Sequence, residues 1–187
     1  MKIVCIASGE SLTPEDVQYC KGKADKIYVV KESYKLAPWA DLLYAADSDW
    51  WDIRKGCPDF AGEKWTCTPE AAKKWGINYI NYKVELKWSL EQGVVATGGN
   101  SGFQCVNLAT LNGATDIILL GYDMGYQQKK HWWDGDESLK RDCRGSNYND
   151  WIKRFHEAAP LIPAKVYNAT RHSYLTCFPK VNLEDVL

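Results

Sequence analysis

Small and polar residues gather at two points of the chain, residues 8–11 (SGES) and 98–102 (GGNSG), each between an apolar run and an expected helix. Such a turn exposes backbone N–H groups at the positive end of the helix dipole, which favours phosphate. Two such turns in one sheet predict a nucleotide site to which both contribute. The candidate binding residues from the two turns are Ser8, Gly9, Ser11, Asn100, Ser101 and Gly102.

Neither turn is a complete motif, so a purely structural role stays open for both. The first has the sequence ASGES, which is neither the G-x-G-x-x-G of dinucleotide-binding proteins nor a P-loop with its lysine. Glu10 also repels a phosphate. In the structural alternative Gly9 only supplies a permissive backbone and Ser8 caps the helix, while residues 98–102 form a tight loop.

Two aspartates, Asp47 and Asp123, follow strongly apolar runs that we expect to be strands. An acid in this position can bind a ribose hydroxyl, coordinate Mg²⁺, or act as a general base once burial raises its pKa. We assign Asp47 to recognition of the ribose or base, and Asp123 to proton abstraction. A solvated strand end is the alternative for Asp47.

Among the three histidines, His131 in the stretch KKHWWDGD is the candidate general base, because imidazole changes its charge near neutral pH. His156 falls on an amphipathic segment and is expected at the surface. His172 stands beside Arg171 and Ser173 after the last expected strand, where it can meet a phosphate or cap a helix. The sequence contains no H-x-x-H, H-E-x-x-H or cysteine cluster, so we expect no metal-ligating set.

Composition indicates one globular domain and argues against nucleic acid and membranes as partners. A chain of 187 residues is long enough for one hydrophobic core, and 23 basic against 24 acidic residues give a net charge of −1, too little to hold nucleic acid. No apolar run approaches the roughly 20 residues that span a bilayer, and no signal-peptide pattern is present. We therefore expect a single cytoplasmic domain over residues 1–187, in the host cytoplasm if a phage encodes it, with oligomerisation left open. The seven cysteines lack a C-x-x-C pair and are expected to be reduced.

Strand-like and helix-like segments alternate along the chain. Strands are expected at residues 2–7, 26–30, 40–47, 63–67, 78–84, 116–124 and 164–170, and helices at 13–22, 50–53, 103–111, 149–162 and after Pro69. This alternation predicts an α/β fold, a Rossmann-like three-layer sandwich with a mostly parallel sheet. Ligands of such sheets bind beyond the carboxyl ends of the strands. The polar and aromatic residues 126–148 are expected to form a lid there.

Five motifs carry a resemblance to known families: CIASGESL, KESYKLAPWADLLYAAD, GGNSG, ILLGYDM and VYNATRHSYLTCFP. In this order they resemble a family of small phage and prophage proteins over nearly the whole chain. Shorter stretches resemble the bacterial lipo-oligosaccharide sialyltransferases, whose fold is Rossmann-like. The opening is also similar to that of the archaeal-type pterin diphosphokinases, which begin with G-x-G-P-S-L.

The resemblance to the sialyltransferases implies roles for individual residues. It implies a nucleotide phosphate at the opening loop, a Ser-Gly pair before a helix, an aspartate at a strand end and a serine after the last strand. The matching residues are Ser8, Gly9, Ser11, Ser101, Gly102, Asp123 and Ser173. The chain departs from the pattern at Glu10, where a proline is expected, and at Glu32, where an asparagine is expected. The catalytic histidine has no direct counterpart, and His131 is the nearest choice.

Together these features predict a nucleotide-dependent transferase, most like a glycosyltransferase with a nucleotide-sugar donor. His131 and Asp123 are its candidate catalytic residues, and Asp47 and Ser173 join the two turns as candidate nucleotide-binding residues. One alternative is an ATP-dependent diphosphotransferase, which requires Mg²⁺ on Asp47 or Asp123. The other is a phage-encoded protein that binds a nucleotide or a host factor without turnover.

Overall fold

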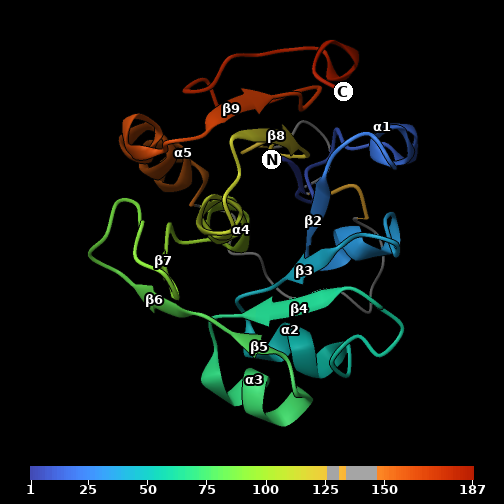
Figure 1. The fold of residues 1–187 in the computed structure, drawn as a ribbon, viewed down its shortest axis with the longest axis vertical. Coiled ribbons are helices and arrows are strands. Elements are labelled where there is room, and N and C mark those ends of the chain that lie inside the picture. Colours follow the sequence, from blue (N-terminus) through green and yellow to red (C-terminus); the bar gives the residue numbers. More distant parts are fainter. Residues whose placement is uncertain (126–130, 134–146) are drawn as a thin grey trace.

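The computed structural model describes residues 1–125, 131–133 and 147–187, and its centre is a parallel sheet (Figure 1). The sheet has seven strands in the order β5-β4-β3-β2-β1-β8-β9. Their bounds are β1 (Lys2–Ile6), β2 (Lys26–Val30), β3 (Leu42–Tyr44), β4 (Glu63–Thr66), β5 (Asn78–Tyr79), β8 (Asp116–Leu120) and β9 (Lys165–Asn168). Every pairing between these strands is parallel, which confirms the predicted Rossmann-like α/β fold.

Helices cover both faces of the sheet and give the molecule three layers (Figure 1). One face carries α1 (Pro14–Cys20), α2 (Ser48–Ile53) and α3 (Pro69–Trp75), and the other carries α4 (Ser101–Leu111) and α5 (Tyr148–Ala158). Residues of β1 alternate between the two cores: Val4 and Ile6 pack on the α1 side, Ile3 and Cys5 on the α4 side. A strand buried on both faces needs a continuous apolar sequence, and KIVCI provides one.

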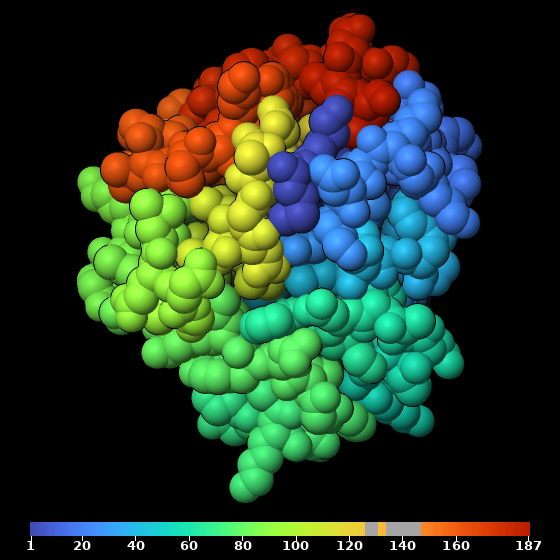
Figure 2. Space-filling model, viewed as in Figure 1, coloured from blue at the N-terminus to red at the C-terminus, as the bar shows by residue number. Residues whose placement is uncertain are grey.

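Shorter elements complete the described chain. The strands β6 (Asn81–Lys83) and β7 (Val94–Ala96) pair in parallel as a second, two-stranded sheet. The single-turn helices are η1 (Lys31–Lys35), η3 (Ala159–Leu161) and η4 (Leu183–Asp185). Figure 2 shows the N-terminal residues in dark blue against the red C-terminal segment, where the Lys2 ammonium donates to the Val186 carbonyl.

The start of α1 is capped by Thr13. Thr13 accepts a hydrogen bond from the backbone N–H of Asp16 at 3.2 Å, and Pro14 occupies the first helical position. This start ends the loop after β1, so that the loop is only a few residues long and stays close to the sheet.

Several predicted strands are wrong in extent. The strand expected at 116–124 ends at Leu120, because Gly121 takes a positive φ of 68° and the Tyr122 N–H donates to the Thr170 hydroxyl. The strand expected at 164–170 is shorter, Lys165–Asn168. The strand expected at 40–47 ends at Tyr44, because the backbone of the next two residues bonds elsewhere: the Ala45 carbonyl to the Trp51 indole, and the Ala46 N–H to the hydroxyl of Ser101. The strand expected at 78–84 divides at Ile80, whose buried side chain marks the crossing from one sheet to the other.

The remaining expectations concern the lid, the cysteines and the membrane. Most of the predicted lid, residues 126–148, lies outside the described residues. Each cysteine that the structure describes is a free thiol: Cys5, Cys20, Cys57, Cys67, Cys105 and Cys177. In the described parts of the chain, no helix has both the length and the apolar character needed to cross a bilayer.

Candidate functional site

The order of the strands changes direction between β1 and β8. From β1 the chain proceeds through β2, β3 and β4 to β5 on one side, whereas β8 and β9 lie on the other. From the carboxyl end of β1 the chain leads to α1 on one face of the sheet, and the helix that follows β8 in the described chain, α5, lies on the other face. In open α/β sheets ligands bind at such a topological switch point.

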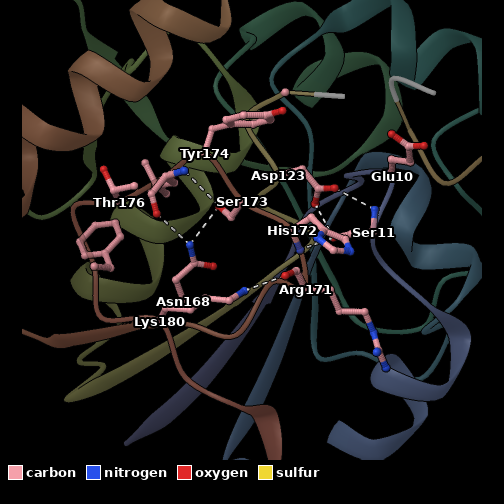
Figure 3. Close-up of a pocket in the computed structure, with 13 residues that line it drawn as sticks. Glu10, Ser11, Asp123, Asn168, Arg171, His172, Ser173, Tyr174, Thr176 and Lys180 are labelled. Atoms are coloured by element: carbon pink, nitrogen blue, oxygen red, sulfur yellow. Dashed lines mark hydrogen bonds between the residues drawn. The ribbon is translucent and has the colours of Figure 1, made fainter. Parts of the chain in front are cut away.

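A pocket of about 790 Å³ lies at this switch point (Figure 3). Its volume falls within the roughly 300–1,000 Å³ that is typical of small-molecule sites. Its walls come from the loop after β1, the loop after β8 and the segment that follows β9. The lining residues that carry the argument are Glu10, Ser11, Asp123, His172, Tyr174 and Lys180.

Asp123 is the buried acid of the pocket, with 5% of its surface exposed. The Ser11 N–H donates to Oδ2 at 2.7 Å and the Ser11 hydroxyl donates to Oδ1 at 3.0 Å. Burial raises the pKa of Asp123 and the charge of Glu10 adds to the rise, while the bonds from Ser11 and the charge of His172 oppose it. A carboxylate with a raised pKa is a stronger base than an ordinary aspartate, as proton abstraction requires.

Gly9 lets the loop after β1 approach the end of β8. A Cβ at Gly9 would lie 2.0 Å from Oδ1 of Asp123 and 2.6 Å from the carbonyl oxygen of Gly121. The Gly9 N–H donates to that same carbonyl at 2.8 Å. Because Gly9 is not among the glycines with a positive φ, the residue is needed for this close approach and not for a left-handed backbone.

We expect Gly9→Ala to lower the free energy of unfolding by about 2 kcal/mol, since overpacking a close contact costs roughly 1–3 kcal/mol. It should also change the pKa of Asp123, measured by NMR titration, because the new methyl group must push the carboxylate away. Gly22→Ala is the control, at a positive φ with no neighbour within 4 Å of its Cβ. The control strains the backbone and leaves the pKa of Asp123 unchanged. A Gly9→Ala protein with wild-type urea unfolding would contradict the account.

The backbone amides of the opening loop bond within the protein. Besides the Gly9 N–H, the Ser11 N–H is bound to Asp123, and the Leu12 N–H donates to the Gly9 carbonyl at 3.2 Å. A phosphate held by Gly9 and Ser11, as the sequence predicts, would have to replace these bonds. The loop in this state positions the carboxylate of Asp123.

Positive charge reaches the pocket from the segment after β9. His172 and Lys180 both line the pocket and are exposed. The His172 N–H donates to the Ser11 hydroxyl at 3.3 Å, and the Lys180 ammonium donates to the Arg171 carbonyl at 3.1 Å. The Arg171 guanidinium itself forms two bonds of 2.7 Å with Asp16. Lys180 is therefore the cation, and His172 the imidazole, best placed to meet an anionic ligand.

Ser173 lines the pocket, but its hydroxyl is fully engaged in the protein. It donates to the Tyr122 carbonyl at 2.6 Å and accepts from Asn168 Nδ2 at 3.0 Å and from the Leu175 N–H at 3.1 Å. A serine hydroxyl has one donor and two acceptor positions, and all three are used. Ser173 thus fixes the segment that carries His172.

The turn at residues 98–102 is bonded in a similar way. The Asn100 side chain caps α4 by accepting from the Phe103 N–H at 2.8 Å. The Ser101 hydroxyl accepts from the Ala46 N–H at 3.1 Å. Both side chains therefore organise the start of α4, and neither lines the pocket.

Gly102 connects this turn to the pocket. Its carbonyl accepts from the Tyr122 hydroxyl at 3.1 Å, and Tyr122 directly precedes Asp123. The two small-residue turns consequently lie at the same edge of the sheet, although only the first borders the pocket.

Asp47 lies outside the pocket. It precedes α2, pairs with Lys31, and has 58% of its side chain exposed. This exposed position agrees with the alternative in which Asp47 is a solvated residue after a strand.

The structure brings Ser8 and His131 together. The imidazole Nδ1 lies 3.2 Å from the Ser8 hydroxyl, and the ring stacks on Trp133 with 4.6 Å between centroids. The Ser8 carbonyl accepts from the Trp132 N–H at 3.3 Å. His131 therefore contacts the loop after β1, but it does not line the pocket.

Tyr174 and Lys180 are lining residues that the sequence analysis did not identify. Both belong to the run of mostly polar residues after β9, and neither has a local sequence signal of function. An isolated β-bridge pairs Lys180 with Asn168, twelve positions earlier in the sequence, and brings Lys180 to the pocket.

The chain matches no protein-family model, no curated protein and no solved structure. Within residues 1–125, 131–133 and 147–187, no group of three His, Cys, Asp or Glu side chains is arranged to hold a metal ion. The fold and the pocket define the class, a Rossmann-like α/β protein with an acidic switch-point pocket, and they are the grounds for inferring its function.

Proposed function

We propose that the protein is a nucleotide-dependent transferase and that it moves a glycosyl group from a nucleotide-sugar donor. The observation that carries the proposal is Asp123, a buried carboxylate of raised pKa in a pocket at the switch point of the sheet. This is the part of a Rossmann-like fold that receives nucleotides, and the acid there is suited to proton abstraction.

Three pocket residues have a role in this reaction. Asp123 takes the proton from an acceptor hydroxyl as the oxygen attacks the anomeric carbon of the donor. The bond to the nucleotide breaks, and its electron pair leaves on the phosphate, whose charge Lys180 offsets and to which the His172 ring can donate a hydrogen bond. Asp123 is preferred to His131 as the base because Asp123 lines the pocket.

The test is calorimetric titration of the protein with CMP, UMP, GMP, ADP and their nucleotide sugars, each with and without Mg²⁺. We expect at least one of these nucleotides to bind with a dissociation constant of roughly 1 µM to 1 mM, the usual range of enzyme substrates, and binding that does not need Mg²⁺. Silence across the panel would overturn the proposal.

The same titration, together with an assay for product, separates the two alternatives. Binding of ATP that requires Mg²⁺ would favour diphosphate transfer in place of glycosyl transfer. If the protein binds without turnover, the wild type forms no product, and the double variant Asp123→Asn with His131→Ala binds the nucleotide with unchanged affinity. A transferase retains affinity in that double variant but loses a product that the wild type makes.

A further inference from the structure

Tyr174 is an exposed aromatic side chain inside the pocket. Fifty-seven per cent of its surface is accessible, and it lines the pocket beside Asp123. Several other large apolar side chains in the described residues are exposed, but none of them lines this pocket: Met1, Ile53, Tyr79, Tyr82, Val84, Leu90 and Leu161. An apolar ring that is exposed to solvent within a polar pocket indicates a contact with a ligand.

The backbone on both sides of Tyr174 is anchored, so the exposure of the ring does not result from a loose chain. The Tyr174 N–H donates to the Asp123 carbonyl at 2.8 Å. Ser173 before it is bonded to Tyr122, and Leu175 after it is buried with 2% exposed. The chain is fixed at three consecutive residues, and only the ring of the middle one points outward.

The ring also packs against the backbone at one edge. It lies so close over Gly125 that a Cβ there would be 2.4 Å from Cδ2 of the ring. A glycine at this position lets one part of the ring rest on backbone while the rest stays accessible. An aromatic ring that is rigid before binding loses little entropy when a flat ligand stacks on it.

Charge is placed on the far side of the same pocket. In Figure 3 the ring of Tyr174 and the ammonium of Lys180 lie on opposite sides of Ser173. A flat apolar surface at one end and a cation at the other match the two ends of a nucleoside monophosphate, its base and its phosphate. Asp123 lines the same pocket.

From this arrangement we infer that Tyr174 is the platform on which the base of the nucleotide stacks, while Lys180 binds its phosphate. The inference rests on the proposed function and adds the orientation of the ligand. It also predicts that the site tolerates more than one base in stacking, because every base offers a flat face.

The experiment measures equilibrium binding of CMP, UMP, GMP and AMP to the full chain, together with ribose 5-phosphate, which lacks the base, and the parent nucleosides, which lack the phosphate. The variants are Tyr174→Ala, Tyr174→Phe and Lys180→Met. Two matched controls lie away from the pocket: Tyr82→Ala, an exposed tyrosine of β6, and Lys165→Met, an exposed lysine at the start of β9.

We expect Tyr174→Ala to weaken the tightest monophosphate about tenfold, within the range measured when stacking aromatics are removed, and to leave ribose 5-phosphate unchanged. Tyr174→Phe keeps the ring and retains wild-type affinity. Lys180→Met weakens the monophosphate about tenfold and leaves the nucleoside unchanged, because it removes a charged hydrogen bond to phosphate. The two controls bind as the wild type does.

Three results would overturn the inference. If the wild type binds a monophosphate and Tyr174→Ala binds it equally well, the platform is absent and the proposed function still stands. If Tyr174→Ala weakens ribose 5-phosphate as much as the monophosphate, the tyrosine does not act on the base. If the wild type binds none of these ligands, the inference and the proposed function fail together.

Discussion

Asp123→Asn is expected to reduce transferase turnover by about 10²–10⁴-fold, the usual contribution of a positioned general base. The amide cannot take a proton at its nitrogen, yet it occupies the same volume. Its oxygen can accept from the Ser11 N–H, and its NH₂ group can donate to the Ser11 hydroxyl once that hydroxyl turns round. The loop after β1 should therefore keep its place, and nucleotide binding should survive.

The measurement is the initial rate of nucleotide release from the donor sugar, at saturating donor, for the wild type and the variant. The acid limb of the wild-type pH profile should lie above about 3.9, the ordinary pKa of an aspartate, because burial raises the pKa of Asp123. Glu10→Gln is the control: it keeps the base but removes a negative charge that contributes to the rise. Its acid limb should move to lower pH. Wild-type turnover in Asp123→Asn would contradict a catalytic role.

Arg54→Met is expected to lower the free energy of unfolding by about 3 kcal/mol, the lower end of what breaking a buried ion pair costs. Arg54 Nε donates to Glu32 Oε1 at 2.8 Å, and the Glu32 side chain is only 2% exposed. The Trp50 indole donates to the same oxygen at 2.8 Å, and Lys35 lies 3.1 Å from the other. These two partners remain in the variant, which is why the lower end applies.

Urea unfolding of two further variants makes this prediction specific. Lys26→Met breaks an exposed pair with Asp41 and should cost at most about 1 kcal/mol. Glu32→Gln combined with Arg54→Met removes both charges of the buried pair and should recover part of the loss of Arg54→Met. A single Arg54→Met variant no less stable than Lys26→Met would contradict the buried pair. Glu32, which departs from the sialyltransferase pattern, is thus a structural residue of the edge where the pocket lies.

The parallel sheet could be predicted from the sequence because each of its central strands is a continuous apolar run. KIVCI, KIYVV and DIILL are each buried on two faces, and such runs indicate parallel strands without further information. The end of the third strand could not be predicted, because Ala45 and Ala46 are apolar and their backbone partners lie on other elements. Burial of apolar side chains alone does not distinguish a strand from the loop that follows it.

The pocket was predictable only in part, because its contacts join residues that are far apart in the chain. Asp123 was identified from its place after an apolar run, and Ser11 from the small-residue turn. The two residues, which form a hydrogen bond, are 112 positions apart in the sequence. Gly9 is needed because the loop lies so close to Asp123, and that contact cannot be read from the sequence. The sequence alone therefore indicated phosphate binding by this loop and did not indicate that the loop positions the Asp123 carboxylate. Tyr174 was not identified, because an exposed tyrosine in a polar run has no local signal of function.

The most direct test of the central claim is a crystal structure of the protein with the tightest nucleotide of the binding panel. We predict the nucleotide in the pocket at the switch point, with its base on Tyr174, its phosphate at Lys180 and the carboxylate of Asp123 within reach of the transferred group. A nucleotide bound at residues 98–102 or elsewhere on the surface, with the pocket beside Asp123 free of it, would contradict the account.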